Sequence, residues 1–169
     1  MVMRSVFAAF ALLALTGCDE GSGGFGTSFQ ERYFVAREAL DNGRYQVAVR
    51  HYGKLANAYP DSPIAIRLRL EMAHAQLRSG QYQDAATTAR GISTVQTGQL
   101  KGMALAVLGT AEHELGRVAL TKDRLAAGGH LRAADAALKE MLRRHPKLDE
   151  GGAMARRHKL LRAELASLG

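Results

Sequence analysis

The chain of 169 residues has no tryptophan, one cysteine and three prolines, and aromatic residues make up only 6% of it. A single cysteine excludes a disulfide bond within the chain. Stretches in which polar and apolar residues alternate as in a β-strand are missing, and the few prolines leave long segments free to form helices. Alanine and leucine supply most of the apolar content, as in helices that pack through small side chains. The sequence therefore predicts an all-α protein, and its length predicts one domain.

Motifs of the common catalytic and metal sites are also missing from the sequence. No two histidines have the His-x-x-His or His-x-x-x-His spacing that would place two imidazoles on one helix face for a metal ion. There is no Gly-x-Ser-x-Gly motif and no phosphate-binding glycine loop. We therefore expect no enzymatic activity, no metal ion and no dissociable cofactor. An enzyme whose polar groups converge only in three dimensions is the alternative.

The positive charge of the chain is concentrated near its C-terminus. The formal net charge is +7, and from Arg117 onward there are twelve lysines and arginines against six aspartates and glutamates. Such an excess can attract anionic lipid or an acidic partner. The alternative is that these bases lie on solvated helix faces with no partner.

The N-terminal segment has the features of a secretory signal. Arg4 precedes an apolar run, Val6–Leu15, that is too short to span a bilayer but suits a signal-peptide core. The run ends in Leu15-Thr16-Gly17-Cys18, which resembles the lipobox of bacterial lipoproteins. This resemblance implies cleavage before Cys18 and a covalent lipid on its thiol, which would be the only bound group of the protein. A buried structural cysteine is the alternative.

The lipobox resemblance also implies a domain organisation and a location. We expect a signal peptide over residues 1–17, a flexible tether rich in glycine and serine over residues 18–28, and a helical domain over residues 29–169. The protein would be anchored in the bacterial cell envelope by lipid and would face the periplasm. Asp19 favours the inner membrane in enterobacterial lipoproteins, but that rule is not general, so inner and outer membrane both stay open.

Two segments of the helical domain are copies of one another. The sequence Gly43-Arg44-Tyr45-Gln46-Val47-Ala48 recurs as Gly80-Gln81-Tyr82-Gln83-Asp84-Ala85, and a looser third copy begins near Leu105. This pattern resembles the tetratricopeptide repeat, a helix–turn–helix unit of about 34 residues. The small and aromatic positions of the family, with its closing proline, match the following residues in the first two copies: Ala36, Tyr45, Ala48, Tyr52, Ala56, Pro60, Ala73, Gly80, Tyr82 and Ala85. The resemblance implies a right-handed α-solenoid of about three helical hairpins with a C-terminal capping helix.

Periodicity and breaker residues predict the helix bounds. The expected helices cover about 29–42, 45–59, 63–78, 82–92, 99–126, 131–144 and 153–168. Ser28 and Glu31 fit a capping box for the first helix, and Ser62 fits a cap for the third. The fifth helix either passes Gly116 and ends before Gly128-Gly129, or breaks at Gly116. We expect the last helix to pack through Leu160, Leu161, Leu165 and Leu168 and to close the open end of the array.

In the repeat family, the first helix of each repeat lines a concave groove. Transferring those positions gives the following groove residues: Gln30, Tyr33, Arg37 and Asp41; Arg67, Leu70, His74 and Arg78; and Met103, Ala106, Thr110 and His113. The resemblance implies a mildly basic groove for an acidic or extended peptide, in which Tyr33 and Leu70 supply apolar contacts. The alternative is that these side chains simply face water.

These expectations lead to a non-catalytic, lipid-anchored scaffold that recruits a protein partner through its groove. The alternative is a structural subunit of an envelope assembly complex, held by its convex face and C-terminal helix. Repeat-containing lipoproteins that assist outer-membrane protein assembly, pilus assembly or secretion are distantly similar. Nucleic acid is not an expected partner, because aromatic residues for base stacking do not accompany the basic segments Arg143–Lys147 and Arg156–Lys159. The second of these segments could rest on anionic lipid head groups.

Overall fold

The computed structural model describes residues 27–168 of the chain. These residues form seven α-helices and one short 3-10 helix, with no β-strand, so the predicted all-α fold is confirmed for this part of the chain. The helices are α1 (Thr27–Asp41), α2 (Tyr45–Ala58), α3 (Ile64–Arg78), α4 (Tyr82–Val95), α5 (Gly98–Ala119), α6 (Arg124–Arg144), η1 (Pro146–Asp149) and α7 (Ala153–Ala166). The predicted signal peptide, Cys18 and most of the tether lie outside the described residues.

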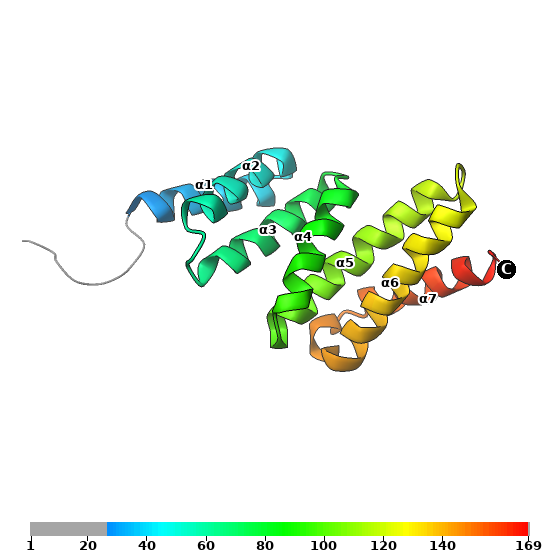
Figure 1. The fold of residues 1–169 in the computed structure, drawn as a ribbon. Helices are drawn as coiled ribbons and strands as arrows, with labels where there is room; N and C mark the ends of the chain where they lie inside the picture. The colour runs from blue at the N-terminus through cyan, green and yellow to red at the C-terminus, as the bar shows by residue number, and fades with distance from the viewer. Residues whose placement is uncertain (1–26, 169) are drawn as a thin grey trace, which may run out of the picture.

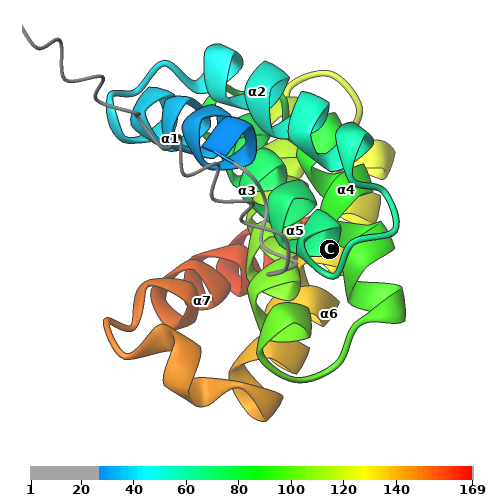
Figure 2. The same cartoon turned by 90° about the vertical axis from the view of Figure 1, so that its left-hand side faces the viewer.

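Each helix packs mainly against the helices that precede and follow it in sequence. Helices α1 and α2, α3 and α4, and α5 and α6 form three hairpins that stand side by side in a row, and α7 packs on α6 at the end (Figure 1). In Figure 2, α1, α3, α5 and α7 lie on the left and in the centre, while α2, α4 and α6 follow one another around the top and right. The odd-numbered and even-numbered helices therefore form two different faces of the molecule.

The first two hairpins turn through the same backbone motif. Gly43 and Gly80 have φ angles of +73° and +80°, a region that glycine adopts without steric cost. In each turn the next amide reaches back five residues: Arg44 N donates to the Ala39 carbonyl at 2.8 Å, and Gln81 N donates to the Gln76 carbonyl at 2.9 Å. This is the Schellman ending of an α-helix. The predicted breaks at these two glycines are confirmed.

The third hairpin turns differently and corrects one predicted boundary. Helix α5 passes Gly116, as one of the two sequence alternatives required, but it ends at Ala119 rather than near Ala126. Helix α6 then begins at Arg124 and runs through Gly128-Gly129, so the predicted break at this glycine pair is wrong. The physical reason is Asp123, whose Oδ1 accepts hydrogen bonds of 3.0 Å from the amides of Leu125 and Ala126 and caps the new helix.

The structure also corrects three smaller predictions about helix ends and packing. Ser28 lies inside the first turn of α1, which begins at Thr27, so it does not occupy the predicted N-cap position. Helix α4 continues to Val95, which leaves only Gln96 and Thr97 as the linker to α5. In α7, Leu161 is fully buried while Leu160 is 51% exposed, so Leu160 is not part of the packed side of that helix.

Small and aromatic residues of the first hairpin occupy the places that the sequence predicts for them. Ala36 of α1 and Ala48 of α2 are fully buried, which lets the two helices come close together. Tyr52 is also fully buried and fills the space beside α1, where its ring meets that of Tyr33 edge-on with centroids 6.1 Å apart. Tyr59 makes a similar contact with Phe29 at 5.3 Å. Aromatic rings therefore supply bulk in a hairpin whose contact surface is built of alanines.

Three glycines bring α5 into close contact with the segment that follows it. Gly102, Gly109 and Gly116 lie seven residues apart on α5, and a Cβ atom at each would come within 2.6 Å of a side chain that follows α5 in the chain. Those side chains belong to Leu131 and Leu138 of α6 and to His145 with Leu148. Residues 131, 138 and 145 are also seven apart. Because the two spacings match, each of these large side chains packs against one glycine along the line of contact between the helices.

We predict that Gly109→Ala lowers the free energy of unfolding by about 1–3 kcal/mol, because overpacking a tight contact forces side chains or backbone to shift. A Cβ at Gly109 would lie 2.6 Å from Leu138 Cγ and 3.3 Å from the Leu138 backbone nitrogen. The matched control is Gly129→Ala on α6, where nothing beyond the adjoining backbone of its own helix lies within 4 Å of the added Cβ. The control should raise stability by about 0.5–1 kcal/mol through helix propensity. Denaturant unfolding measures both, and equal effects would contradict the predicted close approach.

Candidate binding site

A hollow on the face formed by the odd-numbered helices brings together several of the predicted groove residues. We call it the inner hollow. It is lined by Arg37, Leu40 and Asp41 of α1, Tyr45 of α2, Glu71, His74 and Arg78 of α3, and Met103 of α5. Arg37, Asp41, His74, Arg78 and Met103 were all transferred from the repeat family, although they come from three separate helices. The fold therefore gathers five of the transferred residues at one place.

Sequence reasoning missed three residues of the inner hollow. Leu40 and Tyr45 flank the first turn and were interpreted only as packing residues of the hairpin. Glu71 was overlooked, although it lies four residues after Arg67 and three before His74. That spacing puts it on the same helix face as both and would have revealed it.

The charges of the inner hollow are balanced rather than basic. Arg37 Nε lies 3.1 Å from Asp41 Oδ2, and Arg37 Nη1 lies 3.8 Å from Glu71 Oε2. The hydrogen bond to Asp41 is the main reason that the pKa of Arg37 is raised, so Arg37 is neutralised by its own neighbours. Two arginines face two carboxylates in this hollow. The predicted mildly basic character therefore does not describe the hollow as a whole.

Arg78 differs from Arg37 because no carboxylate of the described residues lies within ion-pair distance of it. Its Nη2 donates a 2.6 Å hydrogen bond to the hydroxyl of Tyr45, and its guanidinium carbon lies 5.0 Å from the centroid of the Tyr45 ring. Stacking on the ring fixes the direction of the side chain while leaving its charge uncompensated. Arg78 is therefore the cation that the inner hollow offers to an anionic group.

His74 forms part of the floor of the inner hollow and is only partly exposed. Burial lowers the pKa of His74, because desolvation disfavours the charged imidazolium, and the charge of Glu71 opposes this effect. His74 is therefore neutral at neutral pH and can act as a hydrogen-bond donor or acceptor there.

The remaining transferred residues lie outside the inner hollow. Gln30 and Arg67 are exposed, and Tyr33 is half-buried against Tyr52 and Phe29. Leu70 is only 2% exposed and belongs to the core that α3 shares with α5, so it does not supply the predicted apolar contact. The reason is that α5 packs on this side of α3.

Helix α7 covers Thr110 and His113, two of the four positions transferred from the third repeat. His113 is 1% exposed; its Nε2 lies 2.6 Å from Glu164 Oε2 and its Nδ1 lies 3.1 Å from Arg157 Nη1, both on α7. The Thr110 hydroxyl contacts the sulfur of Met154 at 3.8 Å, again on α7. Thr110 and His113 therefore face a helix of the same chain and not a free groove.

The bonds of His113 belong to a larger group of charges between α5 and α7. Arg157 also donates to Glu114 Oε1 at 2.7 Å, and Arg117 lies 3.7 Å from Glu164. On the other side of α5, the buried Glu112 bonds to Arg90 of α4 and, at 2.7 Å, to His130 of α6. These titratable groups do converge, as the enzyme alternative required, but each is bonded to a residue on a neighbouring helix. The arrangement holds α4, α6 and α7 against α5.

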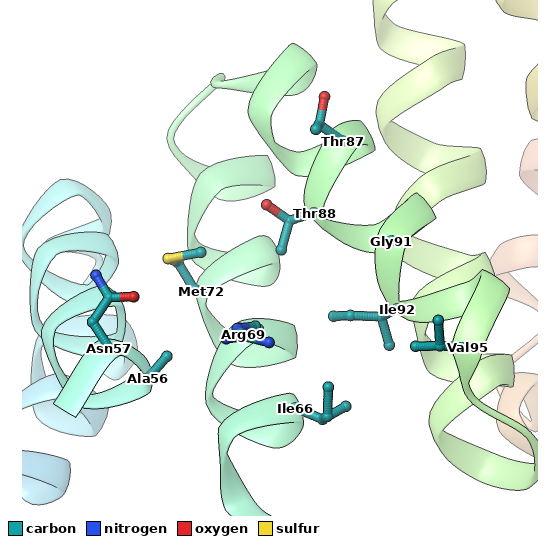
Figure 3. A pocket seen from close by; sticks show the side chains of 11 residues that line it. Ala56, Asn57, Ile66, Arg69, Met72, Thr87, Thr88, Gly91, Ile92 and Val95 are labelled. Atoms are coloured by element: carbon teal, nitrogen blue, oxygen red, sulfur yellow. The ribbon is translucent and has the colours of Figure 1, made fainter. Parts of the chain in front are cut away.

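A second hollow lies on the opposite side of α3. We call it the outer channel; it is lined by Gly53, Ala56, Asn57, Ile66, Arg69, Met72, Thr87, Thr88, Gly91, Ile92 and Val95. Figure 3 shows Ile66, Arg69 and Met72 of α3 at its floor, between α2 and α4. The channel exists because small residues on α2 and α4 leave the side of α3 uncovered. Val95 at its end is 68% exposed.

Within residues 27–168, no group of three or more histidines, cysteines and acids is placed to hold a metal ion. No helix in the same range is long and apolar enough to cross a bilayer. The comparison with protein-family models gave no match, and no curated protein matches the sequence significantly. The geometry of the chain is therefore the basis for a functional proposal.

His74 gives a prediction about pH. Because its pKa is lower in the folded than in the unfolded protein, the unfolded state binds more protons as pH falls below about 6.5, and stability is lost there. Replacing it by His74→Gln should remove this part of the pH dependence, which amounts to about 1.4 kcal/mol for each unit of the lowered pKa. Denaturant unfolding at about pH 7.5 and about pH 5 compares the two proteins. An identical loss of stability in both would contradict the prediction.

Glu164 gives a prediction about the docking of α7. Glu164→Gln should weaken its contacts with His113 and Arg117 and reduce the stability of the α7 contact by about 1–3 kcal/mol. Hydrogen–deuterium exchange should become faster in α7, while α1 and α2 keep their protection. Glu150→Gln is the matched control, because Glu150 is exposed and makes no ion pair within the described residues. Unchanged exchange in α7 of the Glu164 variant would show that apolar packing alone holds that helix.

Proposed function

We propose that the protein is a non-catalytic, lipid-anchored scaffold of the bacterial cell envelope that binds a protein partner at the inner hollow. The observation that carries this proposal is the convergence of Arg37, His74, Arg78 and Met103 from three helices at one hollow. The hollow combines an unpaired cation, a neutral imidazole, a balanced ion pair and a partly buried methionine. Such a mixture suits the side chains and main chain of a peptide.

The repeat character of the fold supports the proposal. Two hairpins share sequence, turn motif and buried small residues, and three hairpins stand in a row, as in a tetratricopeptide-like solenoid. In such arrays the inner helices form an extended binding surface. We propose that α7 takes the place of a further inner helix and closes the row at its C-terminal end, which confines the open part of the surface to α1, α3 and the first half of α5.

The partner that fits the inner hollow carries a carboxylate beside an uncharged segment. Arg78 offers an uncompensated guanidinium that is already oriented by Tyr45, so less side-chain entropy is lost on binding. Arg37 contributes less, because a partner would have to displace Asp41 or Glu71 from it. Of the arginines among the transferred residues, we therefore expect Arg78 to make the main electrostatic contact, since Arg67 does not line the hollow.

The outer channel favours a second candidate function. It is a hollow between α2, α3 and α4 whose lining is mainly apolar apart from Arg69, Asn57 and two threonines, and the exposed Val95 adds to its apolar surface. These are the properties expected if the protein is a structural subunit of an envelope complex held by its outer face. The two functions use opposite sides of α3 and can be tested in one experiment.

We predict that site-specific photo-crosslinking in cells will distinguish the two functions. A photoreactive amino acid in place of Met103 reports on the inner hollow, and one in place of Thr87 reports on the outer channel. The proposed scaffold gives a discrete protein adduct from position 103. Adding Arg78→Gln should reduce that adduct by about 10-fold or more, as expected for loss of a charge-assisted hydrogen bond.

Arg50→Gln is the control for charge, because Arg50 is an exposed arginine on α2 that lines neither hollow. This variant should keep the adduct. If adducts formed only from position 87, the scaffold proposal would be wrong and the structural-subunit function would be favoured. If the adduct from position 103 is unchanged in the Arg78→Gln variant, the inner hollow still binds the partner, but Arg78 does not make the proposed electrostatic contact.

A further inference from the structure

The outer surfaces of α6 and α7 have an unusual distribution of charge. The two helices pack through Leu131, Leu138 and Leu161, which are fully buried. Where they meet at the surface, they form a shallow hollow lined by Leu142 of α6 and by Ala155, His158, Lys159, Arg162 and Ala163 of α7. We call this hollow, together with Lys139 and Arg143 beside it on α6, the basic seam.

Each of the three carboxylates on α6 and α7 bonds to a lysine or a histidine on a different helix. Asp135 lies 2.8 Å from His158, Glu140 lies 3.0 Å from Lys101 of α5, and Glu164 lies 2.6 Å from His113 of α5. Their side chains are 31%, 34% and 20% exposed, respectively. The acids of these two helices are therefore used inside the molecule.

The bases of the basic seam are left without such partners. Lys139 and Arg143 are four residues apart on α6, and Lys159 and Arg162 are three apart on α7, so each pair lies on one helix face. All four are exposed, and within the described residues no carboxylate lies within 4.0 Å of any of them. Like charges at this spacing repel one another. An anionic surface laid across the seam would relieve that repulsion.

Two further features decide which anionic surface fits. Ala155 and Ala163, which line the hollow with Lys159 and Arg162, are exposed. Small apolar side chains between lysines and arginines suit the boundary between lipid head groups and acyl chains, where long basic side chains reach outward to phosphates. The sequence has no phenylalanine, tyrosine or tryptophan after Tyr82, and His158, the one imidazole of the hollow, is bonded to Asp135, so this surface offers no free aromatic ring on which a nucleic-acid base could stack.

We propose that the basic seam docks on a bilayer surface that carries anionic lipid head groups. The seam would fix which side of the helical domain faces the membrane, independently of any lipid attached to the chain. Each base near an anionic bilayer contributes about five-fold in affinity, so four bases together contribute about 600-fold. Because exposed charges are screened by salt, the contribution is greatest at low ionic strength.

Co-sedimentation of the full chain with vesicles tests the proposal. Vesicles of phosphatidylcholine alone are compared with vesicles of phosphatidylcholine mixed with phosphatidylglycerol, and the ratio of the two affinities is the measured quantity. Whatever apolar contribution the first 26 residues make is common to both vesicles and to all variants. The unmodified chain should prefer the anionic vesicles by about 600-fold at low salt. The combined variant Lys139→Gln, Arg143→Gln, Lys159→Gln and Arg162→Gln should lose that preference.

The matched control removes the same number of charges from α1 and α2 and the turn between them: Arg32→Gln, Arg44→Gln, Arg50→Gln and Lys54→Gln, all at exposed positions. It should keep most of the preference for anionic vesicles. Circular dichroism checks that both variants keep their helical content. Equal losses in the two variants would show that only net charge matters and would overturn the docking surface. A chain that binds an RNA oligonucleotide through the seam but shows no preference for anionic vesicles would overturn the lipid assignment.

Discussion

The close contact between α5 and α6 is the constraint on which the C-terminal half of the structure depends. Gly102, Gly109 and Gly116 give α5 a side without Cβ atoms, and side chains at positions 131, 138 and 145 enter it. Large side chains at these three positions would push the helices apart. Because α6 lies so close, Glu112 can reach His130, and α7 can pack on α6 while its charged residues reach His113 on α5. The position of α7, and with it the end of the open surface, follows from three glycines.

Buried charge is used in this structure mainly to hold helices together. Glu112, His113 and Glu164 are bonded across helix boundaries, and two of the three are less than 5% exposed. Removing one partner from such a group leaves the other without compensation, so the contact tolerates little change. The same use of acids leaves α6 and α7 with a surface rich in uncompensated bases. The placement of a few carboxylates therefore explains both how the helices are held together and why the surface of α6 and α7 is basic.

Helix α3 has a comparable double role in the N-terminal half. One side carries Glu71, His74 and Arg78 into the inner hollow, and the other carries Ile66, Arg69 and Met72 into the outer channel. The two hollows differ in chemistry: the first is charged and balanced, and the second has a mainly apolar floor with one arginine. Helix α3 thus presents two different surfaces. On one side, small residues of α2 and α4 leave it uncovered, and on the other side the C-terminal end of α1 lines a hollow with it.

The sequence by itself determined the helical class, the turns at Gly43 and Gly80, and the burial of Ala36, Ala48 and Tyr52, because these depend on local backbone preference and on periodicity within one hairpin. It also identified five residues of the inner hollow, since a repeated hairpin presents equivalent positions at one face. Only the tertiary structure decided that Gly116 and Gly128 lie inside helices, because a glycine that ends a helix and one that admits a neighbouring leucine look alike in sequence. Tertiary packing likewise decided that Leu70 and His113 are covered, since burial at these positions depends on which helix comes to lie beside them.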